Sequence, residues 1–181
     1  ECALMPEEIF KSHTEEIFKS HTITALVEDK PGVLNRIVSM FRRRNYNISS
    51  LAVGHSEIVG MSRMTFVVEC DYSILHLVTT NLDKLVEVIE VENISNDNSI
   101  SRELVLIKIN SDDSVSNEIS HLVDKAGAKI LDRNQGSMII EITGNEDVIN
   151  SFVLSIKKFE VEEIMRTGVI AMNTEQKYLN N

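Results

Sequence analysis

The residues best suited to chemistry lie in one short segment, Glu28-Asp29-Lys30-Pro31-Gly32-Val33-Leu34, where a strand-like pattern changes to a helical one. Gly32 removes a side chain where the backbone enters the helix, so the N–H groups of residues 32 to 34 are predicted to point outward. The positive end of the helix dipole lies behind these amides. The segment therefore suits a small carboxylate ligand, although a Pro-Gly pair also begins many ordinary helices.

Signatures of catalysis are missing from the sequence. The motifs GxGxxG, GxxxxGK[ST], HExxH and GxSxG do not occur. His55, His76 and His121 fall in different predicted elements with no partnering cysteine, so we interpret them as surface or core histidines instead of metal ligands. The acidic pairs Asp112-Asp113 and Glu162-Glu163 fit dipole complementation and solvation better than acid–base catalysis. These observations favour a binding protein over an enzyme, with no metal site.

Composition narrows the class of protein further. The chain has 181 residues, of which 43% are hydrophobic and 25% charged, as in an ordinary globular protein. Its net charge of -10 argues against a nucleic-acid partner, and no apolar run is long enough to predict a membrane span. Cys2 and Cys70 form no disulfide framework, which indicates a reducing compartment. We expect a cytoplasmic protein, with the plastid stroma also compatible.

Two sets of periodic segments follow one another along the chain. The first set predicts strand 22–28, helix 33–45, strands 47–55 and 61–70, helix 74–85 and strand 86–94. Residues 95–101 lack periodicity and predict a linker. The second set predicts strand 103–110, helix 114–126, strands 128–133 and 137–143, helix 145–157 and strand 160–172. Each set has the order βαββαβ.

The βαββαβ order predicts an α+β protein with two ferredoxin-like domains, each a four-stranded antiparallel sheet with both helices on one face. We assign residues 22–97 to the first domain and 98–181 to the second. Residues 1–21 form a tail that carries a tandem repeat of EEIFKSHT, which we interpret as a recent duplication or an artefact. Open sheet edges favour pairing with a second copy, so we expect a homodimer through the first domain.

Several stretches together are similar to a known family. They are ITALVEDKPGVLNRIVSMFRRRNYNISSLAVG, GMSRMTFVVEC, LDKLVEVIEVENIS, SRELVLIKIN, AKILDRNQGSMIIEITG and VEEIMRTGVIAMN. Over about residues 22–173 the chain resembles the small regulatory subunits of acetohydroxyacid synthase, also called acetolactate synthase. PGVL alone occurs in many ACT domains, whereas this combination is specific to one family. The resemblance implies that the first domain is an ACT domain that binds an effector, and that the second serves activation of a catalytic subunit.

The resemblance also implies a function in the biosynthesis of valine, leucine and isoleucine. Small subunits of this family are not catalytic. They stimulate a separate large catalytic subunit, the thiamine-diphosphate enzyme acetolactate synthase, and confer feedback inhibition by a branched-chain amino acid. We expect valine as the allosteric effector, with leucine or isoleucine as alternatives. The chain would hold no cofactor of its own, since thiamine diphosphate, Mg and FAD would belong to the catalytic partner.

The effector site implied by the resemblance lies between two ACT domains, with the effector carboxylate on loop amides. Carried over to this sequence, the site residues are Asp29, Lys30, Pro31, Gly32, Val33 and Leu34 in the loop, and Asn47 and Ile48 at the start of the next strand. Asp29 occupies a position that is often asparagine in the family. A carboxylate accepts a hydrogen bond from an ammonium group but cannot donate one to a carboxylate.

Two other functions are compatible with the same fold. One is a stand-alone ACT-domain sensor that regulates a different enzyme or a transcription factor. The other is an acylphosphatase-like enzyme, which needs an arginine in a phosphate-binding loop, whereas Arg36 lies inside the predicted first helix.

The second domain has Asn110-Ser111-Asp112-Asp113-Ser114 at its first junction, and the two carboxylates there would repel an effector carboxylate. We therefore expect one type of effector site per chain.

Overall fold

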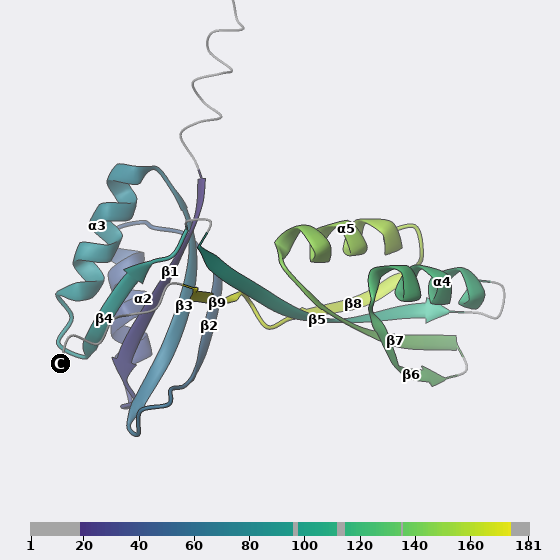
Figure 1. Ribbon diagram of the computed structural model, residues 1–181, viewed down its shortest axis with the longest axis horizontal. Coiled ribbons are helices and arrows are strands. Elements are labelled where there is room, and N and C mark those ends of the chain that lie inside the picture. The colour runs from purple at the N-terminus through teal and green to yellow at the C-terminus, as the bar shows by residue number, and fades with distance from the viewer. Residues whose placement is uncertain (1–18, 96–97, 112–114, 135, 175–181) are drawn as a thin grey trace, which may run out of the picture. The chain divides into compact units, whose positions relative to one another are not determined.

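The computed structural model describes residues 19–95, 98–111, 115–134 and 136–174, which form two units (Figure 1). The first unit contains the described residues up to Ser99 together with 171–174, and the second contains Ile100–Ile170. The sequence assigned residues 98–181 to the second domain as a whole. In the structure, the last described residues of the chain group with the first unit instead.

The first unit has the predicted βαββαβ order, with bounds that differ by a few residues. Its elements are β1 (Lys19–Glu28), α2 (Val33–Arg43), β2 (Ile48–His55), β3 (Met61–Cys70), α3 (Tyr72–Asp83) and β4 (Val88–Asn93). The strand order in the sheet is β2-β3-β1-β4, so β2 and β4 are the edge strands. β1 begins at Lys19, earlier than predicted, because residues 19–22 pair with the end of β3 from Cys70 to Val67.

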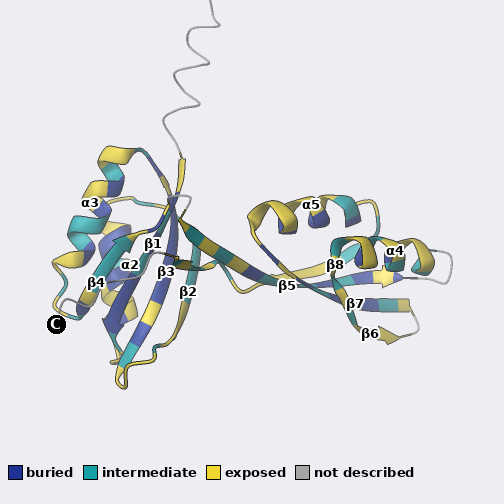
Figure 2. Ribbon diagram, in the orientation of Figure 1, coloured by how far each residue is buried: buried dark blue, intermediate teal, exposed yellow. Residues whose placement is uncertain are grey.

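The core of the first unit lies between one face of this sheet and the two helices (Figures 1 and 2). Alternate residues of β1 and β3 point to the same face because side chains alternate along a strand. Phe66 on β3 stacks against Phe41 on α2, with ring centroids 5.4 Å apart. Full burial of such a side chain contributes about 1.5–3 kcal/mol. The helices are therefore held by apolar contacts with the two central strands.

His21 and Cys70 are both buried in the first unit. The imidazole of His21 packs edge-to-face on Tyr72, with ring centroids 5.1 Å apart, and neither ring nitrogen has a hydrogen-bond partner among the residues that the structure describes. Burial raises the pKa of the Cys70 thiol, so this side chain stays protonated at neutral pH. Both residues thus belong to the core.

The second unit repeats the ferredoxin-like plan and confirms the predicted fold class. Its elements are β5 (Ser99–Ser111), α4 (Ser116–Ala126), β6 (Lys129–Asn134), β7 (Gly136–Gly144), α5 (Glu146–Ile156) and β8 (Val161–Arg166). The short strand β9 (Ile170–Asn173) follows along the chain, and its residues from Ala171 onward group with the first unit. The strand order is β6-β7-β5-β8, and β9 pairs with β5. Its core combines Ile107 and Ile140 from the central strands with Ile119 and Phe152 from the helices.

Two predicted boundaries in the second half are wrong. The predicted linker 95–101 is too long, because β5 already begins at Ser99. The predicted strand 160–172 is interrupted after Arg166, and β9 begins at Ile170. Gly168 has a φ of 81°, a left-handed conformation that an extended strand does not contain. No helix in the described parts of the chain is long and apolar enough to cross a membrane.

Two helices begin with matching side-chain caps. The Asp71 carboxylate accepts a hydrogen bond from the Ile74 N–H at 2.9 Å and another from the Ser73 hydroxyl at 2.6 Å. These two hydrogen bonds, the one from Ser73 first, lower the pKa of Asp71. At α5 the neutral Asn145 side chain accepts from the Val148 N–H at 3.0 Å. The two caps differ mainly in charge.

We expect Asp71→Ala to lower the stability of the first unit at neutral pH. Because the folded-state pKa of Asp71 is lowered, its contribution is present above the unfolded-state value and is lost as pH falls through the folded value. The difference between wild type and variant should therefore shrink in acid, which urea unfolding at several pH values measures. Asn145→Ala is the matched neutral control and should cost about 1 kcal/mol at each pH. A loss of stability in Asp71→Ala that is the same at every pH would contradict this account.

Candidate functional site

The loop between β1 and α2 is fixed by backbone hydrogen bonds to neighbouring turns. The Glu28 N–H donates to the Glu87 carbonyl, and the Asp29 N–H donates to the Gly60 carbonyl, both at 2.8 Å. The Lys30 ammonium pairs with the Glu28 carboxylate at 2.9 Å. The backbone of the predicted effector loop is therefore held in place on the sheet.

Gly32 caps α2 in a left-handed conformation, with φ 92° and ψ -13°. No side chain caps this helix, and Pro31 precedes it in a turn instead of forming its first turn. Within the described residues, the N–H groups of Gly32, Leu34 and Asn35 have no hydrogen-bond acceptor. The Val33 N–H makes a 3.3 Å hydrogen bond to the Lys30 carbonyl. Three outward amides thus remain at the positive end of the helix dipole.

The loop side chains differ in what they offer a ligand. Val33 is buried in the core, so only its backbone faces the loop surface. Leu34 is 46% exposed and provides an apolar surface beside the outward amides. Asn35 was not among the sequence-predicted site residues, because the pattern did not fix the residue at which the helix begins. Its amide extends the group of outward donors to one more position.

The structure adds a residue that the sequence analysis did not select. His55 ends β2, and its Nδ1 lies 3.1 Å from the Asp29 Oδ2. β1 and β2 both pair antiparallel with β3, so they run parallel to each other, and their carboxyl ends lie at the same end of the sheet. The predicted ferredoxin-like topology could have pointed to His55 by this route. His76 and His121 are exposed, as expected for surface histidines.

Asn47 and Ile48 lie at the opposite end of the unit from the loop. They precede and begin β2, whereas Asp29 lies beside its last residue, His55. A strand of this length, eight residues, spans about 23 Å. The sequence-predicted site residues therefore form two separate groups within one chain, one in the loop and one at the start of β2.

The edge of the first sheet at β2 carries exposed apolar side chains. Val53 on β2 is 50% exposed, and it pairs with Met64 of β3, whose side chain packs in the core beneath the helices. Leu34 and Val38 are four residues apart on α2 and are both exposed, so they share one side of the helix. An edge strand with an exposed apolar side chain is suited to strand pairing.

The described part of the first junction in the second unit differs from this loop. Asp112 and Asp113 lie outside the described residues. Before them, Asn110 is tied to Glu160 by its backbone N–H at 2.8 Å and by its side-chain amide at 3.0 Å. α4 begins after Val115, which has an ordinary right-handed conformation, with no glycine and no side-chain cap. The described part of this junction offers no loop like that of residues 29–32.

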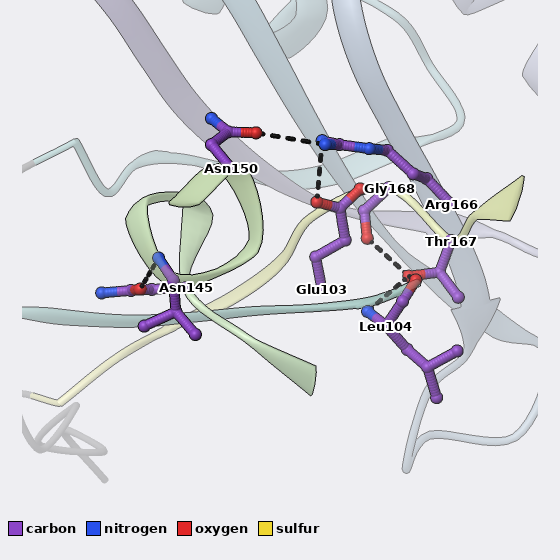
Figure 3. Close-up of polar contacts among 8 residues, drawn as sticks. Glu103, Leu104, Asn145, Asn150, Arg166, Thr167 and Gly168 are labelled. Carbon is purple, nitrogen blue, oxygen red and sulfur yellow. Dashed lines mark hydrogen bonds and ion pairs between the residues drawn. The ribbon is translucent and has the colours of Figure 1, made fainter. Parts of the chain in front are cut away.

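A polar cluster in the second unit has a structural explanation (Figure 3). The Glu103 carboxylate is 6% exposed and lies 3.3 Å from the Arg166 guanidinium, which also donates to the Asn150 side chain at 3.1 Å. Beside it, the Leu104 N–H donates to the Thr167 hydroxyl at 3.2 Å. A buried carboxylate needs such partners. The cluster therefore anchors the end of β8 to β5.

No group of three or more His, Cys, Asp or Glu side chains in the described residues is arranged to hold a metal ion. The geometry that remains for function is the loop of the first unit, with its outward amides, its exposed leucine and the Asp29–His55 pair.

Comparisons with known proteins show the family to which the chain belongs. Residues 23–90 match the family described as the AHAS small subunit-like ACT domain, and residues 102–175 match the small subunit of acetolactate synthase. The chain is 43% identical over 151 residues to the probable acetolactate synthase small subunit of Archaeoglobus fulgidus, covering 83% of this chain and 94% of that protein. It is 37% identical over 162 residues to the Bacillus subtilis small subunit, covering 88% and 94%.

A solved structure has the same fold over most of the chain. The acetolactate synthase small subunit of Thermotoga maritima superposes with a TM-score of 0.81 at 38% sequence identity. The match covers 87% of this chain and 99% of that one. These matches confirm the family resemblance found in the sequence.

We expect Gly32→Ala to destabilise the first unit by about 1 kcal/mol, because an L-residue is strained at a φ of 92°. A Cβ at this position would meet no atom within 4 Å, so backbone strain is the expected cause. Gly54→Ala is the control, since Gly54 also has open space but no positive φ. Urea unfolding should show the control unchanged or slightly stabilised. Equal effects of the two substitutions would refute the strain account.

Proposed function

The chain belongs to the family of acetolactate synthase small subunits, and we propose that it is a regulatory subunit that binds a branched-chain amino acid and controls a separate catalytic subunit. Valine is the proposed effector, with leucine and isoleucine as the alternatives. The observation that carries the proposal is the loop at residues 29–34, where outward amides begin a helix in the domain that matches the family's ACT domain.

The proposed contacts follow from the chemistry of the loop. The effector carboxylate accepts hydrogen bonds from the outward amides of Gly32 and Leu34, and the helix dipole favours its negative charge. The ammonium group is attracted by the Asp29 carboxylate. The exposed side chain of Leu34 offers an apolar contact to the branched aliphatic group.

We propose that the site is complete only in a dimer. The predicted residues form two groups at opposite ends of β2, and β2 is an edge strand. If β2 pairs antiparallel with β2 of a second copy over its whole length, Ile48 of the second copy lies opposite His55. Asn47 of the second copy then comes next to the loop that carries Asp29. Antiparallel pairing of this edge thus joins the two groups.

The proposed partner is the large catalytic subunit of acetolactate synthase. The relatives are named as small subunits of this enzyme, which supports a larger partner. Thiamine diphosphate, Mg and FAD would be held by that subunit, and the chain itself would be non-catalytic. We assign effector binding to the first unit and contact with the catalytic subunit mainly to the second, which lacks a comparable effector loop in its described part.

We expect Val53→Lys to give a monomer by analytical ultracentrifugation and to weaken valine binding at least about tenfold by calorimetry. A lysine on an edge strand opposes strand pairing, and Val53 is exposed enough to be replaced without loss of the core. Ile89→Lys is the matched control, because Ile89 is similarly exposed on β4, the other edge strand. If Ile89→Lys dissociates the dimer and Val53→Lys does not, the dimer contact lies at β4, and the proposed contact at β2 is wrong.

Reconstitution tests the regulatory role. A pull-down from native extract should recover a large thiamine-diphosphate-dependent subunit. We expect that subunit to form acetolactate from pyruvate faster when the purified chain is added, and valine to inhibit only the mixture. The chain alone should form no acetolactate. A catalytic subunit whose rate and valine response ignore the chain would contradict the proposal and favour a stand-alone sensor.

A further inference from the structure

The face of the first sheet that is turned away from its helices holds a cavity of about 290 Å³. We infer that this cavity is a second ligand site, which binds a small organic amine in its charged ammonium form. The described residues that line it include none from the proposed effector loop or from the start of β2. The inference therefore does not depend on the proposed function.

The floor of the cavity is a row of three side chains on adjacent strands. Thr24 of β1 lies opposite Thr65 of β3 on one side and opposite Glu92 of β4 on the other. The neighbours of Thr65 along β3, Met64 and Phe66, are buried in the core beneath the helices. Because side chains alternate along a strand, Thr65 and the rest of the row point away from the helices.

A salt bridge and the last described strand complete the lining. Arg63 of β3 points to the same face as the row, and its guanidinium donates to the Glu57 carboxylate at 3.0 Å. Residues 171–173 of β9 also line the cavity, and the Asn173 side-chain amide donates to the Glu92 Oε1 at 2.8 Å. These residues of β9 group with the first unit, so the cavity is bounded by that unit alone.

Two hydroxyl groups on the floor lack a partner. Thr65 is 7% exposed, and its hydroxyl makes no hydrogen bond to any residue that the structure describes. The hydroxyl of Thr24 is likewise unpaired among those residues. Most buried polar side chains in proteins have a hydrogen-bond partner, and an unpaired one lowers stability. A ligand that pairs with these hydroxyls removes that penalty.

The charges around the cavity select a cation over an anion. The hydrogen bond with Glu57, followed by the negative charges of Glu57, Glu90 and Glu92, raises the pKa of Arg63. The hydrogen bond from Arg63 in turn holds the pKa of Glu57 at about 2, so both partners are charged at neutral pH. Three carboxylates thus face one guanidinium. A carboxylate ligand is repelled by this group of charges, and an ammonium ligand is attracted.

A primary ammonium group matches the chemistry of the floor. It has three N–H donors and no acceptor, and the Thr24 hydroxyl, the Thr65 hydroxyl and the Glu92 carboxylate all accept hydrogen bonds. Met172 also lines the cavity and offers an apolar contact to an alkyl chain. Because the volume is at the lower end of the range for ligand pockets, the amine should have a short chain.

Titrations of the full chain with n-butylammonium, butanol and butyrate, followed by amide chemical shifts, test the inference. The probes are similar in size and differ in charge. We expect n-butylammonium to bind with a dissociation constant of about 1 mM and to shift the signals of Thr24, Thr65 and residues 171–173. Butanol should bind at least about tenfold more weakly, and butyrate should not bind. Equal affinity for butanol, or no shift at these residues with n-butylammonium, would overturn the inference.

Two substitutions test the floor directly. Thr65→Val should weaken n-butylammonium binding at least about fivefold, because it removes a hydroxyl acceptor. The urea midpoint should stay unchanged or rise, since this hydroxyl has no partner among the described residues of the free chain. Glu92→Gln should weaken binding to a similar extent, because it removes the charge and keeps an acceptor for Asn173.

Thr22→Val and Glu69→Gln are the matched controls. Both residues lie on the same face of the sheet, on β1 and β3, and neither lines the cavity. They should bind n-butylammonium as the wild type does. If Thr65→Val and Glu92→Gln also keep the wild-type affinity, the amine binds elsewhere on the chain, and the assignment of this cavity is wrong.

Discussion

The candidate site depends on one constraint, the pairing of β1 with β3 over its whole length from Lys19 to Glu28. Because β2 also pairs antiparallel with β3, β1 and β2 must run parallel. The carboxyl ends of β1 and β2 then lie at the same end of the sheet, which places His55 against Asp29. The same constraint sends α2 back across the sheet and leaves Asn47 at the far end. One strand register thus decides which residues belong to each group.

Much of the fold was predictable from local pattern, and the exceptions have local causes. Helical and alternating periods predicted the four helices of the described residues and the order of the strands from β1 to β8. The break after Arg166 was missed, because a single glycine with positive φ inside an apolar stretch has no periodic signal. The start of β1 was missed because Lys19–His21 lie in a polar repeat, where pairing with β3 overrides composition.

The site was predictable in part for the same reason. Pro31-Gly32 marks a helix start in sequence, and helix geometry predicted the outward amides of Gly32 and Leu34. The prediction for Val33 was wrong, because its N–H donates to the Lys30 carbonyl. The Asp29–His55 pair joins residues 26 positions apart through the sheet, so it required the topology as well as the pattern. A comparison of the two units also shows that the fold alone does not determine the candidate site. They share a fold, yet a left-handed glycine junction occurs in the first, whereas α4 in the second begins without one.

A site divided between two copies would couple effector binding to dimer geometry. An effector that contacts both copies binds the dimer and not the monomer, so by mass action it stabilises the paired state. Because α2 carries both the outward amides at its start and the exposed Leu34 and Val38, a shift of this helix at the interface changes the site and the contact surface together. A coupling free energy of about 1–3 kcal/mol is typical of such linkage and is enough to alter the activity of a bound partner.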